Sequence, residues 1–401
     1  MIHLHSRRTG GARRARTGAA IAAAACLALA ACGSGSGAAG GGGGGGDETV
    51  KITVLTDSSG KAAFFGTAIA DSAKFTEKYI NDKGGMDGKK VVIDVQDTTS
   101  AVGTASQQMA KAVSGDTDAV IFGVLTEEAL AIAPLAQDAK LPMVNIQAGG
   151  DGVTEVGDYI WRITPQQALF YPKFAKYLAE KKGTTSASVF YVTDNAPSVE
   201  LATKVMPKAF ADAGIKVLDK VASSSTETDL SGAVSKLMKG NPDHIQTQAI
   251  GAQNVTLITQ LRRAGYKGTI GGGTSLGAGA LTDLPADQSN GILYYSSFVG
   301  SPDLPWKAGS EFSVAYEKAT GDQPNTFHAE TFDAFNLIQE AVLKSGGSSR
   351  EDIEKGMNEV ASSGGLAAAQ AEKLTFDERD AKGPGVVIEW QDGKETLAPG
   401  Q

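Results

Sequence analysis

The strand–helix–strand unit that decides the fold is residues 51–95, which read KITVLTDSSGKAAFFGTAIADSAKFTEKYINDKGGMDGKKVVIDV. Residues 51–55 predict a β-strand, and a polar turn follows them. The next positions recur every three or four residues, which predicts one face of a helix: Phe65, Ile69, Ala73, Thr76 and Ile80. Gly84-Gly85 predicts the end of that helix, and the mostly apolar residues 91–95 predict a second strand.

The alternation of strand and helix continues along the chain. Strands are expected at 119–123 and 143–146 with helices between them, so the first unit is predicted to be a parallel sheet with helices on both faces. A second α/β series runs from 170 to 272. After residue 291 we expect one more strand, three helices and a final β pair around the turn Asp392-Gly393. The fold class is therefore α/β, with two units in sequence.

The N-terminus has the features of a secretory signal. Residues 1–31 contain five arginines and no acidic residue. Their apolar run, 19–31, is shorter than the roughly 20 residues that a membrane-spanning helix needs. The stretch Leu29-Ala30-Ala31-Cys32 is similar to the bacterial lipobox, which implies cleavage before Cys32 and a diacylglycerol on its thiol. An ordinary signal peptide with an incidental cysteine is the alternative, and Ser6-Arg7-Arg8 leaves the twin-Arg export route open beside the general secretory route.

Residues 32–46 are expected to form a flexible tether, because after Cys32 they contain only Gly, Ser and Ala. Removal of the signal lowers Lys plus Arg from 37 to 32 and leaves Asp plus Glu at 45, which gives a net charge of −13. A nucleic-acid partner is therefore not expected. The body contains no cysteine, and His244 and His328 have no spacing typical of metal ligands. We expect neither a metal nor a cofactor.

Several motifs together resemble the leucine/isoleucine/valine-binding protein family, the type I periplasmic solute-binding proteins of ABC transporters. The helix end at 79–88, YINDKGGMDG, is the most specific of them. The others are Ala119 to Gly123, Trp161 to Pro165, Phe332-Asp333-Ala334 and Thr375-Phe376-Asp377. The resemblance covers nearly everything from residue 50 to the C-terminus.

The resemblance implies two doubly wound parallel-sheet lobes joined by three crossings of the chain. The lobes would close on a small solute and dock on ABC permease subunits served by a separate ATPase. The protein would act as a monomer, held by its lipid on the outer face of the cytoplasmic membrane. The expected division is a signal peptide at 1–31, a tether at 32–46, a first lobe at 47–165 plus 292–375, and a second lobe at 166–291 plus 376–401.

The resemblance also indicates which loops of the first lobe contact solute, since ligands of open α/β sheets lie beyond the carboxyl ends of the strands. Phe65 stands where the family offers an aromatic ring, although it could equally belong to the core. Thr126-Glu127 opens a helix whose N-terminus favours an anion, although Thr126 could be a plain N-cap. Gln147-Ala148-Gly149 stands where the family normally has a Ser or Thr.

The second lobe departs further from the family. In the loop that contains Asn195 and Pro197, Pro197-Ser198 replaces a common Tyr-Gly pair, and Gly251-Ala252-Gln253 stands where a Tyr is common. Thr274-Ser275 stands where amino-acid binders place a Glu against the ligand ammonium. A buried ammonium without a paired anion is very costly. We therefore expect a solute other than a typical α-amino acid, such as an amide, a short acid or a neutral polar molecule. The alternative is a branched-chain amino acid-like solute held by a changed set of contacts, in which Glu127, Glu128, Asp151 or Asp194 supplies the anion.

Two other functions fit parts of the sequence. Gly273-Thr-Ser-Leu-Gly277 matches the nucleophile elbow of α/β-hydrolases, with His328 downstream and Asp283 and Asp303 between them. A serine hydrolase that uses Ser275 is therefore a remote alternative to a protein that is not an enzyme. A ligand sensor that signals through a membrane receptor is the nearer alternative, because its lobes would look the same.

Overall fold

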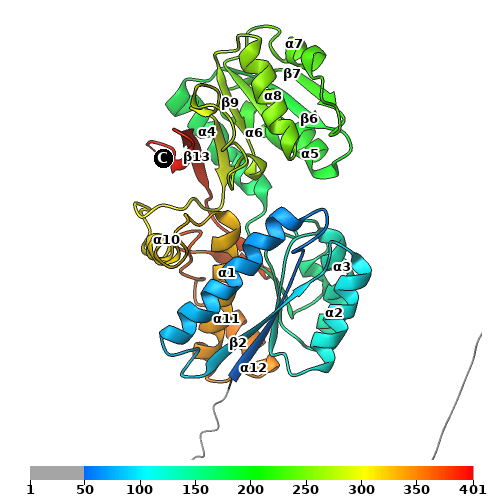
Figure 1. The fold of residues 1–401 in the computed structure, drawn as a ribbon, viewed down its shortest axis with the longest axis vertical. Coiled ribbons are helices and arrows are strands. Elements are labelled where there is room, and N and C mark those ends of the chain that lie inside the picture. The colour runs from blue at the N-terminus through cyan, green and yellow to red at the C-terminus, as the bar shows by residue number, and fades with distance from the viewer. Residues whose placement is uncertain (1–48, 401) are drawn as a thin grey trace, which may run out of the picture. The chain divides into compact units, whose positions relative to one another are not determined.

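The computed structural model describes residues 49–400, and the predicted signal peptide, Cys32 and the tether lie outside them. The described chain forms two seven-stranded sheets, each at the centre of one lobe (Figure 1). The strand order of the first lobe is β11 (Thr375–Asp377), β12 (Asp380–Lys382), β5 (Ile160–Arg162), β4 (Met143–Asn145), β3 (Ala119–Phe122), β1 (Thr49–Thr56) and β2 (Lys90–Asp97). The order of the second lobe is β14 (Lys394–Leu397), β13 (Val386–Gln391), β10 (Leu293–Ser296), β9 (Thr269–Gly272), β8 (His244–Gln248), β6 (Ser186–Val192) and β7 (Lys216–Ser223).

Both sheets are parallel through their centres and antiparallel only at one edge. In the first sheet β11 runs against β12, and in the second β13 runs against both β10 and β14. All four side chains of β3 are buried, as expected of a parallel strand covered on both faces. The predicted α/β class with two doubly wound lobes is therefore confirmed.

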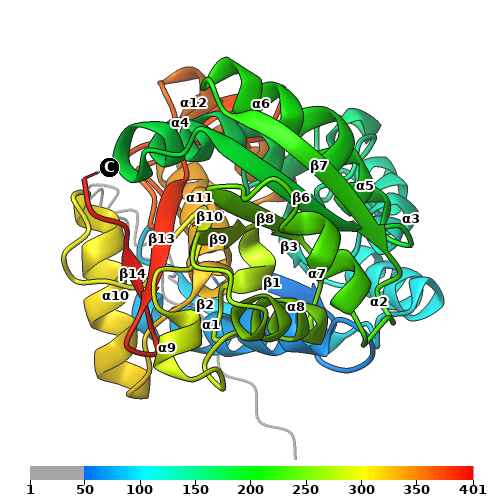
Figure 2. The same ribbon diagram turned by 90° about the horizontal axis from the view of Figure 1, so that it is seen from above.

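Helices cover both faces of each sheet. In the first lobe α1 (Ala63–Asp82), α11 (Thr326–Ser345) and α12 (Arg350–Ser362) share one core, while α2 (Val102–Ser114) and α3 (Thr126–Asp138) form the other. Figure 2 shows the same arrangement in the second lobe. Its helices are α4 (Tyr171–Lys182), α5 (Ala196–Glu200), α6 (Met206–Asp212), α7 (Ser231–Leu237), α8 (Ala252–Arg263) and α9 (Ala286–Ser289).

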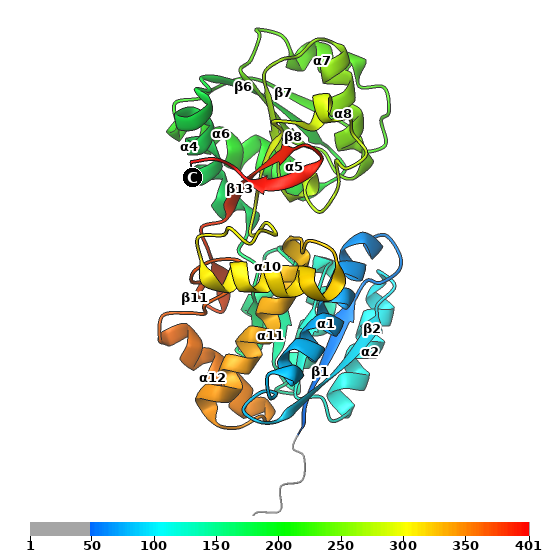
Figure 3. The ribbon, with the colours of Figure 1, turned by 60° about the vertical axis from the view of Figure 1, so that its left-hand side comes forward.

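The helix α10 (Lys307–Thr320) lies across the first lobe (Figure 3). Its Phe312 packs against Phe332 of α11, with ring centroids 4.6 Å apart, and against Phe75 of α1 at 6.0 Å. The start of α11 is thereby held between α1 and α10. No described helix is both long and apolar enough to cross a membrane.

The motif at the end of α1 has a clear physical basis. Gly85 has φ +82°, which L side chains rarely adopt, and a Cβ on it would collide with the Lys89 carbonyl. The glycine allows Met86 and Lys89 to form an antiparallel β-bridge directly before β2 begins at Lys90. The predicted turn near the C-terminus also forms, since Asp392 and Gly393 both have positive φ between the paired residues Gln391 and Lys394.

The structure moves two of the expected lobe boundaries. β10 pairs with β9 in the second sheet, so the chain crosses to the first lobe after Ser296 and not at residue 292. β12 pairs with β5 in the first sheet, so the final crossing lies between Lys382 and Val386 and not at residue 376.

Candidate functional site

The loops that follow the central strands hold the predicted solute-binding residues. In the first lobe these loops follow β1, β3 and β4, and in the second they follow β6, β8 and β9. Adjacent parallel strands place their carboxyl ends along the same edge of a sheet, which is where open α/β sheets bind ligands.

Thr126 joins two loops of the first lobe. It is the first residue of α3, and Leu125 occupies the N-cap position, so the alternative that Thr126 is the N-cap is wrong. The Thr126 hydroxyl accepts a hydrogen bond from the Gly150 backbone N–H at 3.2 Å. A side chain at position 150 would collide with Thr126. The start of α3 and the loop after β4 therefore form one surface.

Glu127 faces solvent and already has a cationic partner. Its carboxylate accepts a hydrogen bond from Lys61 Nζ at 2.6 Å, and both side chains are more than half exposed. The hydrogen bond from Lys61 lowers the pKa of Glu127 and raises that of Lys61. Glu127 is consequently ionised and paired at neutral pH.

Phe65 lies in a cluster of three aromatic rings. Its ring meets Phe327 of α11 edge-on at 5.0 Å and Phe64 at 5.4 Å. Phe64 is 57% exposed, whereas Phe327 is buried. Sequence reasoning missed both partners. The adjacent Phe64 and Phe65 at the start of a helix were a usable signal, but only the tertiary fold brings Phe327 to them.

The three residues predicted after β4 differ in their exposure to solvent. Ala148 is buried, and Gly149 is exposed. Gln147 is partly exposed, and its side-chain amide donates a hydrogen bond to the Glu330 carboxylate of α11. Sequence reasoning did not identify Glu330.

A buried pair of carboxyl groups lies beside this surface. Asp57 follows β1 and Glu128 is in the first turn of α3, and neither side chain is exposed. The Thr98 hydroxyl donates to Glu128 Oε2 at 3.3 Å. Burial, followed by the neighbouring Asp57 carboxyl, raises the pKa of Glu128 to about 8. The pair therefore retains a proton at neutral pH, which avoids two adjacent buried charges.

In the second lobe the loop after β6 is held by its own hydrogen bonds. The Asn195 side chain accepts from the Ser198 N–H at 2.9 Å and caps the short helix α5, in which Pro197 lies in the first turn. Asp194 accepts from the Ser225 backbone N–H and hydroxyl at 3.0 and 2.7 Å. The Asp194 carboxylate is therefore turned toward the 224–225 turn.

The loops after β8 and β9 present neutral groups. Gly251, with φ +53°, precedes α8, and Ala252 is the first residue of that helix. Thr274 accepts a hydrogen bond from Gln167 Nε2 at 3.0 Å. Beside it, Gln248 donates to the Tyr171 hydroxyl at 2.6 Å. Burial raises the pKa of Tyr171 well above its ordinary value, so this group is also neutral.

Ser275 has no catalytic partners among residues 49–400. Its hydroxyl donates to the Ala249 carbonyl at 3.0 Å and accepts from Asn254 Nδ2 at 3.2 Å. The proposed general base, His328, instead accepts a hydrogen bond from the Asn325 N–H and helps to cap α11. The local sequence matches a nucleophile elbow, but the three-dimensional arrangement does not.

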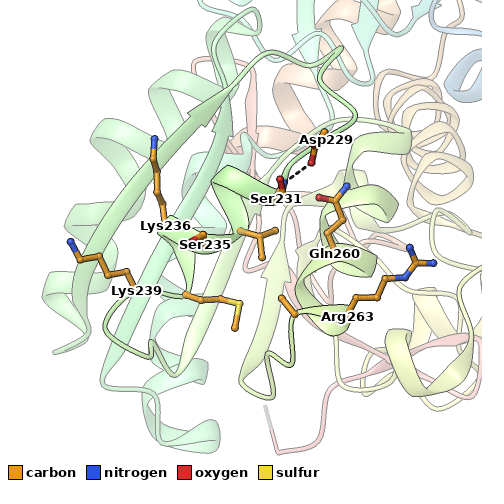
Figure 4. A pocket seen from close by; sticks show the side chains of 10 residues that line it. Asp229, Ser231, Ser235, Lys236, Lys239, Gln260 and Arg263 are labelled. Carbon is orange, nitrogen blue, oxygen red and sulfur yellow. Dashed lines mark hydrogen bonds between the residues drawn. The ribbon is translucent and has the colours of Figure 1, made fainter.

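A prominent surface pocket of the described chain contains none of the predicted solute-binding residues. It is a surface hollow of about 820 Å³ between α7 and α8 (Figure 4). Lys236, Lys239 and Arg263 stand on its rim near the C-terminal ends of the two helices, where cations interact favourably with the helix dipole. Within the described residues there is also no cluster of acidic, His or Cys side chains that could hold a metal ion.

Comparisons with known proteins agree with this architecture. Residues 49–394 match the family model described as periplasmic binding protein. The Leu/Ile/Val-binding protein homolog 7 of Brucella suis is 23% identical over 364 residues, which cover 86% of this chain and 90% of that protein.

Solved structures show the same fold. LivJ of Streptococcus pneumoniae, a branched-chain amino acid transporter substrate-binding protein in complex with isoleucine, superposes with a TM-score of 0.74 at 21% identity. The match covers 87% of this chain and 98% of LivJ. A solute-binding protein of an ABC transporter from Rhodopseudomonas palustris, in complex with 3,4-dihydroxybenzoic acid, gives 0.70 at 21% identity, covering 86% and 95%.

Proposed function

This chain belongs to the periplasmic binding protein family, and on that premise we propose that it captures a small organic solute between its two lobes and delivers it to an ABC permease. The family is extracytoplasmic and consists of solute-binding proteins, not of enzymes. Binding would shift an equilibrium between open and closed lobes, which requires that the solute has a higher affinity for the closed form.

The neutral strand ends of the second lobe carry the proposal about solute class. Thr274 stands where the family's amino-acid binders place a Glu, and Asp194, the acidic residue after β6, is bonded to Ser225. A buried ammonium without an anion would be strongly disfavoured. We therefore assign a solute without an α-ammonium group: a short or aromatic carboxylic acid, or an amide.

The first lobe supplies features that suit such a solute. The Phe64-Phe65 pair offers an apolar surface. The first turn of α3 offers backbone N–H groups toward a carboxylate, because no side chain caps that helix. The solved structures of this fold include complexes with isoleucine and with 3,4-dihydroxybenzoic acid, so the fold itself accepts both kinds of solute.

The proposed contact set combines both lobes. Its members come from the segments that follow six central strands. Each would contact solute through a side chain or a backbone group except the buried Ala148, which would shape its loop. They are Phe65, Thr126, Glu127, Gln147, Ala148, Gly149, Asn195, Pro197, Gly251, Ala252, Thr274 and Ser275.

Calorimetric titration tests the solute class. Leucine, isoleucine and valine are compared with benzoate, 3,4-dihydroxybenzoate and a short aliphatic amide, all at the same protein concentration. We expect one of the last three to bind with micromolar affinity and the three amino acids not to bind. Micromolar binding of leucine, isoleucine or valine would show that the assigned class is wrong.

We further propose that the chain is a monomer anchored by a lipid on Cys32, with residues 32–46 as the tether that lets the lobes reach the permease. The support is the lipobox-like stretch that ends at Cys32 and the Gly-rich segment after it. Replacing the lipid-bearing residue, Cys32→Ser, is expected to release the protein from the membrane fraction into the medium. Full retention of the variant on the membrane would refute the anchor.

A further inference from the structure

Glu330 occupies an unusual position for an acidic residue. It lies in the second turn of α11, it is 1% exposed, and its carboxylate is surrounded by three side-chain donors from three different segments. The Ser297 hydroxyl donates to Glu330 Oε1 at 2.7 Å, and the Thr326 hydroxyl donates to the same oxygen at 3.2 Å. The Gln147 amide donates to the other oxygen, Oε2.

The three donors belong to parts of the chain with different roles. Gln147 belongs to the loop after β4, which is part of the candidate solute-binding surface. Ser297 directly follows β10, so it is the first residue of the crossing from the second sheet to the first. Thr326 is the first residue of α11 and is also bonded to Ser297, with their hydroxyl oxygens 2.6 Å apart.

The Glu330 carboxylate can hold these three segments together because of its hydrogen-bonding chemistry. A carboxylate only accepts hydrogen bonds, and each of its oxygens can accept more than one. Burying it is costly unless donors surround it. Removing it would leave the Gln147 amide and one of the two hydroxyls without this acceptor, because Ser297 and Thr326 can still bond to each other. The Gln147 amide and the Ser297 hydroxyl do not bond to each other, so their connection runs through Glu330.

We propose that Glu330 is a positioning residue that fastens the solute-facing loop after β4 to the crossing after β10. The loop then keeps its place relative to the segment around which the lobes must move. This inference rests on the proposed solute-binding function for its consequence, but the fastening itself does not depend on the identity of the solute.

Asp333 provides a matched control one turn further along α11. It is fully buried, and burial raises the pKa of both carboxyl groups to about 7. Its donors are the backbone N–H groups of Ala369 and Gln370 and the Gln370 side chain, none of which belongs to the β4 loop or to the crossing. Removing either carboxylate should destabilise the fold, but only Glu330 should act on the loop.

Hydrogen exchange measured by mass spectrometry tests the fastening without any solute. The variants are Glu330→Met, Asp333→Leu and Glu330→Gln. We expect Glu330→Met to speed exchange at least tenfold in peptides covering 146–150 and 296–300. Asp333→Leu should speed exchange around 366–370 instead. Glu330→Gln should stay close to the wild type, because the Gln147 amide can turn and accept from the new amide group.

Gln147→Met keeps the test decisive if Glu330→Met does not fold, since the Gln147 side chain is partly exposed and its loss is easier to tolerate. It should give the same faster exchange at 146–150. Unchanged exchange at 146–150 in both variants, or equal effects of Glu330→Met and Asp333→Leu there, would overturn the proposal.

Affinity provides the functional readout, with benzoate, 3,4-dihydroxybenzoate and isoleucine as the probes. For a probe that binds the wild type, Glu330→Met should weaken binding at least tenfold and Asp333→Leu less than twofold. Faster exchange of the loop with unchanged affinity would overturn the positioning role. If isoleucine is the probe that binds the wild type, the assigned solute class is wrong. If no probe binds, hydrogen exchange alone decides whether Glu330 fastens the loop.

Discussion

The buried pair of Asp57 and Glu128 predicts an unusual pH dependence of stability, which Glu128→Gln should remove. An exposed glutamate has a pKa of about 4.5, and burial beside Asp57 raises that of Glu128 to about 8. The unfolded chain therefore releases this proton at a lower pH than the folded chain does. Above pH 4.5 the folded state binds more protons than the unfolded state, so stability falls as the pH rises, until the folded group also ionises near pH 8.

The magnitude follows from the two pKa values. Each unit between them corresponds to about 1.4 kcal/mol, so the full difference is about 5 kcal/mol. About 4 kcal/mol of it is lost between pH 4.5 and pH 8, because each state is half ionised at its own pKa. Glutamine matches the shape of glutamate, can accept from Thr98 and can donate to Asp57, but it does not titrate. We therefore expect the variant to match the wild type near pH 5 and to be more stable by a few kcal/mol near pH 8.

Urea unfolding at pH 5, 6, 7 and 8 measures this difference. The matched control is Glu127→Gln, because Glu127 is the neighbouring residue but is exposed and paired with Lys61. Its removal should leave the slope of stability against pH nearly unchanged, as expected for a surface ion pair. If the free energies of unfolding of the wild type and of Glu128→Gln change in parallel between pH 5 and 8, Asp57 and Glu128 do not retain a proton at neutral pH.

Three further predictions concern other parts of the molecule. Gly85→Ala should lower the free energy of unfolding in urea by more than about 2 kcal/mol, because the new Cβ would collide with the Lys89 carbonyl and the residue would keep a positive φ. Gly84→Ala is the control: its Cβ would meet no neighbouring atom at φ +99°, so it should cost about 1 kcal/mol. Phe64→Ala should weaken solute binding in calorimetry about tenfold with little loss of stability, since the ring is mostly exposed; unchanged affinity would exclude it from the site. A fluorophosphonate probe should give no adduct on Ser275, and labelling there would reinstate the hydrolase.

The alternation of strands and helices was predictable because it follows from the spacing of apolar residues within each segment. The spacing of Ile69, Ala73 and Ile80 predicted a buried helix face, and all three side chains are buried in the first lobe. The missed strands are short: β5, β11 and β12 have three residues each. Segments of that length have too few positions to show a period, so their strand character depends on the neighbours that pair with them.

The same limit applies to the lobe boundaries. Residues 292–298 were predicted to form a strand, but the sequence of a strand does not indicate which sheet it joins. In the structure β10 pairs with β9, so the chain is still in the second lobe at this strand. The crossing then follows at Ser297, the residue that Glu330 holds. Because the predicted boundary lay at residue 292, Ser297 was not identified as the start of the crossing, and its hydrogen bond to Glu330 was not expected.

The candidate site was predictable only as a set of loops, because its side-chain pairs join residues that are distant in sequence. Gln147 was identified from its place after β4, whereas its partner Glu330 is 183 residues away on a helix in which the sequence indicated no solute-facing residue. Phe65 and Phe327 are a second pair of this kind. In the first pair the residue from α11 meets the loop after β4, and in the second it meets the first turn of α1. α11 therefore contributes to the site as well as covering the sheet, and variants at its N-terminal end should change solute affinity more than variants at its C-terminal end.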